Sequence, residues 1–119
     1  MDTDLKRAKK IAELNDKFRQ SICSPNRDEL SAEVVITNGL YDLLATTPGT
    51  FEFFSSIGRY DSFKENNDPH SEHDFGSLEW HGETVFWKID YYDRDLRYGK
   101  DPLDVECKRV LTILLASEY

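Results

Sequence analysis

The feature that most constrains the fold is a pair of strand-like segments in the second half of the chain. Residues 75–80 and 84–91 are rich in aromatic and β-branched residues, and His81-Gly82-Glu83 joins them. A connection of about three residues that contains glycine is typical of a β-hairpin. We therefore expect a hairpin over residues 75–91 to form the centre of a sheet.

The second strand of this hairpin has two chemically different faces. Its alternate positions are apolar on one side, which carries Val85, Trp87, Ile89 and Tyr91. The opposite side carries Phe86, Lys88, Asp90 and Tyr92. Because side chains alternate across a strand, we predict that Val85, Trp87 and Ile89 are buried, with Lys88 and Asp90 more exposed. The mixed face is suited to binding.

Two helices are predicted before the hairpin. Residues 4–22 place apolar side chains three and four positions apart, with Asp2, Thr3 or Asp4 as the N-cap and Ser24-Pro25-Asn26 as the end. Thr47-Pro48 predicts the start of a second helix that ends near residues 58–61. Between them, residues 32–37 predict a short strand that ends in a turn at Asn38-Gly39.

Three further segments are less regular. Residues 40–44 are predicted to be an irregular return or a short helical turn, and residues 64–73 and 93–101 are predicted to be loops. At the C-terminus, Asp101-Pro102 and the spacing of apolar residues predict a helix from about 102 to 117. A strand over residues 109–115 is the competing interpretation.

These elements predict one domain over residues 1–119. The fold class is α+β, with an N-terminal helix, a small antiparallel sheet centred on the 75–91 hairpin, and helices packed on one face. The N-terminus lacks the apolar stretch of a signal peptide, and we expect a cytoplasmic protein. Its two cysteines, Cys23 and Cys107, are expected to be reduced thiols.

The charge is strongly acidic and uneven. The chain has 15 Lys and Arg against 23 Asp and Glu, a net charge of −8, and residues 61–106 contain thirteen of the acids with only five bases. A chain with this balance does not bind the nucleic-acid backbone through a global positive field. Its field favours a cationic partner, although a solvated acidic face is the simpler explanation.

One dense cluster of potential ligands precedes the hairpin. It consists of Asp68, His70, Glu72, His73 and Asp74. These are residue types that bind zinc and catalytic transition metals, which makes a metal-dependent hydrolase that uses His73 and Asp74 one hypothesis. No third histidine follows at a typical ligand spacing, so we favour a structured turn and expect neither metal nor cofactor.

A second cluster spans Asp90-Tyr91-Tyr92-Asp93-Arg94-Asp95. Two of its carboxylates could act as acid and base, but Arg94 and Arg97 could equally neutralise them in salt bridges. The chain contains no phosphate-binding glycine loop, nucleophile elbow or zinc-protease motif. We therefore predict no catalytic residues.

Four segments carry a family resemblance. They are IAELND-x-FR at 11–19, NDP-x-x-EHDFG at 67–76, VFWKIDYYDRDLRYG at 85–99 and RVLTILLASEY at 109–119. Together they resemble a small proteobacterial family with a domain of unknown function, often found on plasmids and other mobile elements. The resemblance implies an accessory protein of mobile DNA, a context in which small acidic proteins block DNA-binding machinery, as anti-CRISPR proteins do.

This resemblance and the charge together lead to a hypothesis of function. The chain is expected to be an anti-CRISPR-type inhibitor that binds the basic DNA-binding groove of a CRISPR effector and excludes target DNA by mimicry. The expected charged contacts are Asp68, Glu72, Asp74, Asp90, Asp93, Asp95, Asp101 and Asp104. The expected aromatic anchors are Trp80, Tyr92 and Tyr98. The alternatives are the metal-dependent hydrolase and a plasmid accessory factor with another protein partner.

Overall fold

A four-stranded mixed sheet forms the centre of the protein. The computed structural model describes residues 2–23 and 32–119. The strands are β1 (Ala32–Ile36), β2 (Phe75–Trp80), β3 (Glu83–Tyr92) and β4 (Lys108–Leu115), in the spatial order β1-β4-β3-β2. The predicted β2–β3 hairpin is confirmed, and β4 extends it as a further antiparallel strand. β1 then pairs with β4 in parallel. The sheet is therefore mixed, whereas the sequence predicted an antiparallel sheet.

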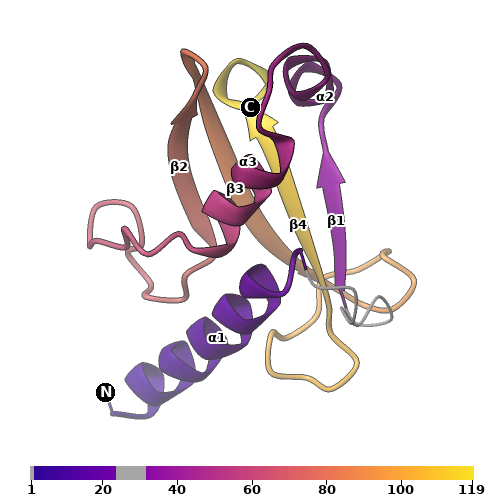
Figure 1. Cartoon of the computed structure of the whole chain (residues 1–119). Helices are drawn as coiled ribbons and strands as arrows, with labels where there is room; N and C mark the ends of the chain where they lie inside the picture. The colour runs from indigo at the N-terminus through magenta and orange to yellow at the C-terminus, as the bar shows by residue number, and fades with distance from the viewer. Residues whose placement is uncertain (1, 24–31) are drawn as a thin grey trace.

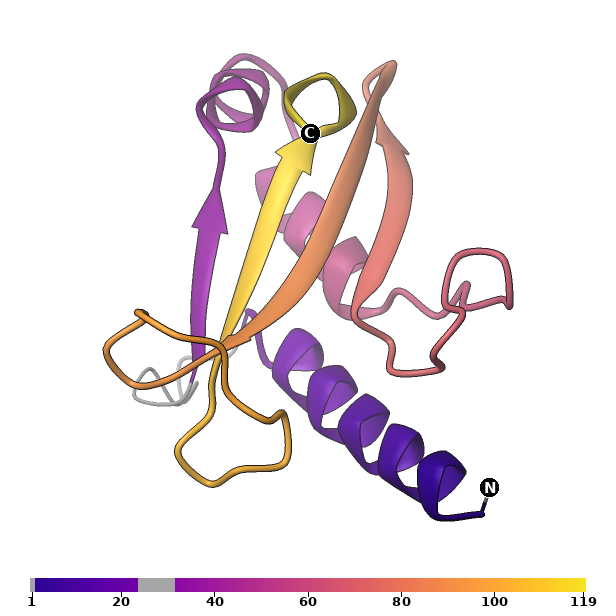
Figure 2. The same cartoon turned by 180° about the vertical axis from the view of Figure 1, so that it is seen from behind.

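In the described part of the chain, three α-helices and a short C-terminal 3₁₀ turn accompany the sheet. They are α1 (Asp2–Gln20), α2 (Asn38–Thr46), α3 (Thr50–Gly58) and η1 (Ala116–Glu118). α3 lies across one face of the sheet, and α1 runs past the lower end of the strands (Figure 1). The view from behind shows the strands in front of α3 (Figure 2). The predicted α+β class and the N-terminal helix are thus confirmed.

The face of the sheet that α3 covers forms the core. Val85, Trp87 and Ile89 are buried, as their alternation predicts. They pack with Leu111 and Ile113 of β4 and with one face of the helices, to which Phe18, Leu40, Leu44, Phe53 and Ile57 belong. Of the predicted apolar stripe of α1, Ile11, Ala12 and Phe18 are buried, whereas Leu5 is exposed beyond the edge of the core.

The predicted C-terminal helix is wrong, and the competing strand is correct. Residues 101–107 form turns, in which Asp101 Oδ1 accepts a hydrogen bond from the Leu103 amide and Asp104 Oδ1 accepts one from the Glu106 amide. These aspartates close local turns and do not cap a helix. β4 follows, because its alternate side chains from Arg109 onward enter the core.

The middle of the chain also differs from expectation. Asn38-Gly39 begins α2 and makes no turn, because Glu118 accepts a hydrogen bond from the Gly39 amide. Thr47 does not cap the next helix: its hydroxyl donates to Leu43 O, at the end of α2. Gly49, with φ 94°, is the N-cap of α3. The predicted helix end at Ser24-Pro25-Asn26 lies outside the described residues.

Candidate functional site

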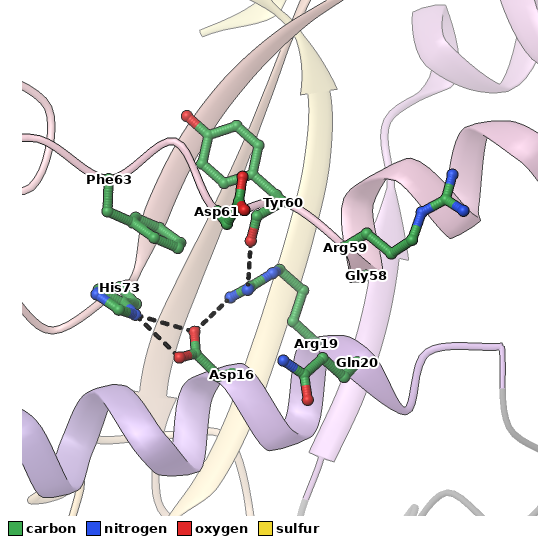
Figure 3. A pocket seen from close by; sticks show the side chains of 9 residues that line it. All are labelled: Asp16, Arg19, Gln20, Gly58, Arg59, Tyr60, Asp61, Phe63 and His73. Atoms are coloured by element: carbon green, nitrogen blue, oxygen red, sulfur yellow. Dashed lines mark hydrogen bonds and ion pairs between the residues drawn. The ribbon is translucent and has the colours of Figure 1, made fainter.

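Polar side chains of α1 meet the loop before β2 in one cluster. We call it the His73 cluster and define it as Asp16, Arg19, Phe63, Asp68 and His73. His73 Nδ1 lies 3.0 Å from both carboxylate oxygens of Asp16, and His73 Nε2 lies 3.7 Å from Asp68 Oδ2. The imidazole stacks flat on Phe63, with 3.9 Å between ring centroids. In Figure 3 the Asp16 carboxylate lies between His73 and Arg19.

Arg19 is the buried member of this cluster. Its side chain is 1% exposed, and it donates hydrogen bonds to Ile57 O, Tyr60 O and the Asp16 carboxylate. The guanidinium also lies 4.9 Å from the centroid of the Trp87 ring. Burial lowers the pKa of Arg19, and the bond to Asp16 opposes that shift. Arg19 therefore fastens α1 to the end of α3 and needs Asp16 as its counter-ion.

A hollow of about 570 Å³ opens beside the cluster, and Asp16, Arg59, Tyr60 and His73 are among its lining residues. A general base must present a ring nitrogen to a substrate proton. In His73, Nδ1 is bound to the Asp16 carboxylate, and Nε2 lies 3.7 Å from Asp68 Oδ2, beyond hydrogen-bond distance. Among residues 2–23 and 32–119, no group of three or more His, Cys, Asp or Glu side chains is arranged to hold a metal ion. The contact between His73 and Asp16 connects the loop before β2 to α1.

Two further members of the predicted ligand cluster are partly buried carboxylates. Burial, followed by repulsion from Asp74, raises the pKa of Glu72. Burial, followed by repulsion from Asp68, raises the pKa of Asp74. The carboxylate bound to His73 is Asp16, a residue that the hydrolase hypothesis did not name. Burial is thus the main cause of both pKa shifts, and a neighbouring carboxylate adds to each.

A second buried polar group ties α1 to the sheet. Asn15 is fully buried; its Nδ2 donates to Glu72 O and to Tyr91 Oη, and its Oδ1 accepts from Arg109 Nε at 2.7 Å. Burial raises the pKa of Tyr91, and the bond from Asn15 partly offsets that shift. Each of these polar atoms has a partner, as buried polar groups require.

The loop between β3 and β4 gathers most of the remaining predicted acids. We call residues 93–106 the acidic loop; it extends beyond the lower end of the sheet (Figure 2). Asp101 pairs with Arg7 of α1 at 2.8 Å, and Asp104 lies 3.8 Å from Lys100. Asp93 accepts a hydrogen bond from the Arg97 amide. On neighbouring β3, Asp90 pairs with Lys88 at 3.0 Å. Several of the predicted contact acids thus already have partners within the chain.

The three predicted aromatic anchors differ in their surroundings. Trp80 is half-buried and packs edge-on against Phe53 of the core, with ring centroids 5.3 Å apart. Tyr92 is half-buried at the end of β3. Tyr98, in the acidic loop, is 73% exposed. Of these residues, Tyr98 has the exposure that an anchor for a partner requires.

Sequence reasoning missed several of the residues that organise these surfaces. Asn15, Asp16 and Arg19 all lie within the IAELND-x-FR segment of α1, but helical periodicity marks only the apolar positions of this segment. Leu96 and Val105 were missed as well, and they are exposed apolar side chains of the acidic loop. The signal for the first group was the motif itself; the signal for the second was a pair of apolar residues within a charged loop.

Fold and site together define an α+β domain in which buried polar residues fix the N-terminal helix to the sheet. The profile of a family described as a protein of unknown function, DUF3768, matches residues 36–118, and the chain belongs to this family. No curated protein and no solved structure matches the chain. Within the described residues, no helix has the length and apolar character needed to cross a membrane.

Proposed function

We propose that this chain is a protein-binding module without catalytic activity, which docks its acidic loop on a basic surface of a partner protein. One observation carries the proposal: the acidic loop combines five carboxylates with the exposed apolar side chains of Leu96, Tyr98 and Val105. Val105 is 86% exposed and Tyr98 is 73% exposed. Aromatic and aliphatic anchors surrounded by charges are the usual composition of an interface.

The ion pairs of the acidic loop do not oppose this role. The pair between Arg7 and Asp101 is about half exposed on both sides, and the pair between Arg94 and Glu106 is at least as exposed. Exposed pairs of this kind contribute only about 0.2–1 kcal/mol each. The carboxylates can therefore exchange an internal cation for a cation of the partner with little loss of stabilising free energy. The apolar side chains then supply most of the affinity.

The partner that fits best is the basic DNA-binding groove of a CRISPR effector. Carboxylates in the groove would occupy positions that DNA phosphates otherwise take, and the Arg and Lys side chains that bind phosphate also bind carboxylate. The net charge of −8 supports attraction to such a groove and repulsion from DNA. Binding would then exclude target DNA, which makes the chain an anti-CRISPR-type inhibitor.

A mobility-shift assay with a purified CRISPR effector and labelled target DNA tests this function. The chain should reduce the fraction of shifted DNA when it is added before the DNA. The double variant Tyr98→Ser and Val105→Ser should lose most of this inhibition, because it removes both exposed anchors. Leu5→Ser, a change at a similarly exposed apolar residue of α1, is the matched control and should inhibit as the parent does. Inhibition that the double variant retains would contradict docking through the acidic loop.

The hydrolase alternative was predicted from His73 and Asp74, of which His73 lines the hollow beside Asp16. It is tested separately by the metal content of the purified chain and by phosphodiesterase and esterase assays with added zinc or manganese. A stoichiometric metal, with an activity that Asp16→Asn abolishes while the fold is kept, would favour the enzyme. If the chain is a binding module, it should show no phosphodiesterase or esterase activity under these conditions and should inhibit DNA binding by the effector.

A further inference from the structure

The free edge of β1 offers backbone groups for pairing. Among residues 2–23 and 32–119, β1 is the outermost strand on its side of the sheet, and neither view shows a described strand beyond it (Figures 1 and 2). The Thr37 amide donates to Ile113 O, so the odd-numbered residues of β1 turn their backbone groups towards β4. Because these directions alternate along a strand, Val34 and Ile36 direct their N–H and C=O groups away from the sheet.

Two apolar hollows lie beside this edge, on the face that α3 covers. Val34, Phe51 and Phe54 line the first, of about 360 Å³. Ile36, Tyr41 and Phe54 line the second, of about 240 Å³. Val34 and Ile36 are two positions apart, a spacing of roughly 6.6 Å along a strand. That is also the spacing of alternate side chains in an extended peptide laid against β1.

The rims of both hollows are apolar and exposed. Phe51 is 68% exposed and Tyr41 is 62% exposed, so neither ring is buried in the core. The charged residues of β1, α2 and α3 have one sign. Residues 32–58 contain Glu33, Asp42 and Glu52 and neither lysine nor arginine. An extended segment that places two apolar side chains between basic residues is therefore complementary to this edge in backbone, shape and charge.

We infer that β1 accepts an extended segment of a partner protein as a fifth strand, with two alternate apolar side chains in the hollows and lysine or arginine on either side of them. Addition of a strand to an exposed sheet edge derives affinity from main-chain hydrogen bonds and specificity from pockets for alternate side chains. This site lies on β1, α2, α3 and the two residues Ile22 and Cys23 that come shortly after α1, and it involves no residue of the acidic loop.

A synthetic peptide tests the inference. The probe is a fluorescein-labelled nine-residue peptide in which leucine and threonine alternate between terminal lysines. The control peptide has the same sequence, but the backbone nitrogens of its leucines are methylated. Fluorescence polarisation should show saturable binding of the first and at least tenfold weaker binding of the second, because N-methyl groups remove strand donors. Hydrogen exchange should slow at the amides of Val34 and Ile36 and stay unchanged at Val35, which already faces β4.

Two substitutions connect the binding to the hollows. Phe51→Ser and Tyr41→Ser change exposed side chains and should weaken probe binding at least fivefold with the thermal unfolding curve retained. Leu5→Ser should bind as the parent does, because Leu5 is equally exposed but lies on α1. The inference is overturned if the N-methylated peptide binds as well as the probe, if the Val34 and Ile36 amides gain no protection, or if light scattering shows that β1 pairs with a second copy of this chain instead.

Discussion

His73 occupies an uncommon backbone conformation, with φ 55°. A histidine pays an energetic penalty in this left-handed region, so its surroundings must hold it there. They do so through the Asp16 carboxylate, the stack on Phe63 and the Asp68 carboxylate, which also accepts a hydrogen bond from the His73 amide. At the residue scale, this side chain connects α1 to the loop before β2.

Replacement of His73 by alanine should therefore destabilise the fold. We expect His73→Ala to lower the free energy of unfolding by about 1–2 kcal/mol, since Asp16 and the Phe63 ring each lose a contact. Urea unfolding monitored by tryptophan fluorescence measures this change. His70→Ala, at an exposed position three residues earlier, is the control and should change stability by less than about 0.5 kcal/mol. Equal stability of the two variants would contradict the positioning role.

Asp74 gives a prediction with a defined pH dependence. Its pKa is raised in the folded protein, chiefly by burial and then by Asp68. The folded state therefore binds the proton more tightly than the unfolded state, and the contribution of Asp74 to stability falls as the pH rises through the window above its unfolded value. Asp74→Asn cannot ionise. It should raise stability at pH 7, by roughly 0.5–1 kcal/mol, and should have little effect near pH 3.

Urea midpoints at both pH values check this expectation. Asp95→Asn, at an exposed position of the acidic loop, is the matched control. A stability gain at pH 3 as large as that at pH 7 would show that the charge of Asp74 is not its cause.

At the scale of elements, Gly76 sets how closely β2 packs on the core. A Cβ at this position would overlap the indole ring of Trp87, which is fully buried and has no room to move. Gly76→Ala should therefore destabilise the protein by about 2–3 kcal/mol. Gly82→Ala is the contrasting substitution, because no atom lies within 4 Å of its Cβ position and only its φ of 83° opposes the change. Differential scanning calorimetry should find the lower Tm for Gly76→Ala.

The elements also show which parts of the fold a single sequence can predict. β3 was predictable because Val85, Trp87 and Ile89 alternate strictly with other positions. β4 was ambiguous, because Val110, Leu111 and Leu114 satisfy helical spacing as well, and only the pairing with β3 and β1 decides for a strand. Asp101-Pro102 gave the same signal as a helix cap, although the Asp101 carboxylate closes a local turn.

The candidate site was predictable only in part, and the reason is distance along the chain. Asp68 and His73 lie in one charged segment that the sequence marks clearly. Their partner Asp16 is 57 positions from His73, on a helix whose polar face carries other charged residues as well. No local pattern specifies which of these charges turns towards the loop; the packing of α1 on the sheet decides it.

At the scale of the whole molecule, the proposed docking depends on where the negative charge lies as well as on its sum. The triple variant Asp90→Lys, Asp93→Lys and Asp95→Lys reverses charge in and beside the acidic loop. A second triple variant, Glu13→Lys, Glu65→Lys and Glu83→Lys, changes the net charge by the same amount at exposed positions elsewhere. The first should reduce the association rate with a CRISPR effector at least tenfold more than the second, because charges near the contact steer encounter most strongly.

Surface plasmon resonance at rising salt measures this difference. Salt shortens the Debye length from about 10 Å at 0.1 M to about 3 Å at 1 M, so the association rate of the parent should fall towards that of the first variant as salt increases. The dissociation rate should respond more to Tyr98→Ser, which removes an anchor and no charge. If both triple variants slow association equally, the net charge of the chain determines the association rate, and the charges of the acidic loop contribute no more than charges elsewhere. Association that ignores salt and both variants would contradict the electrostatic mechanism altogether.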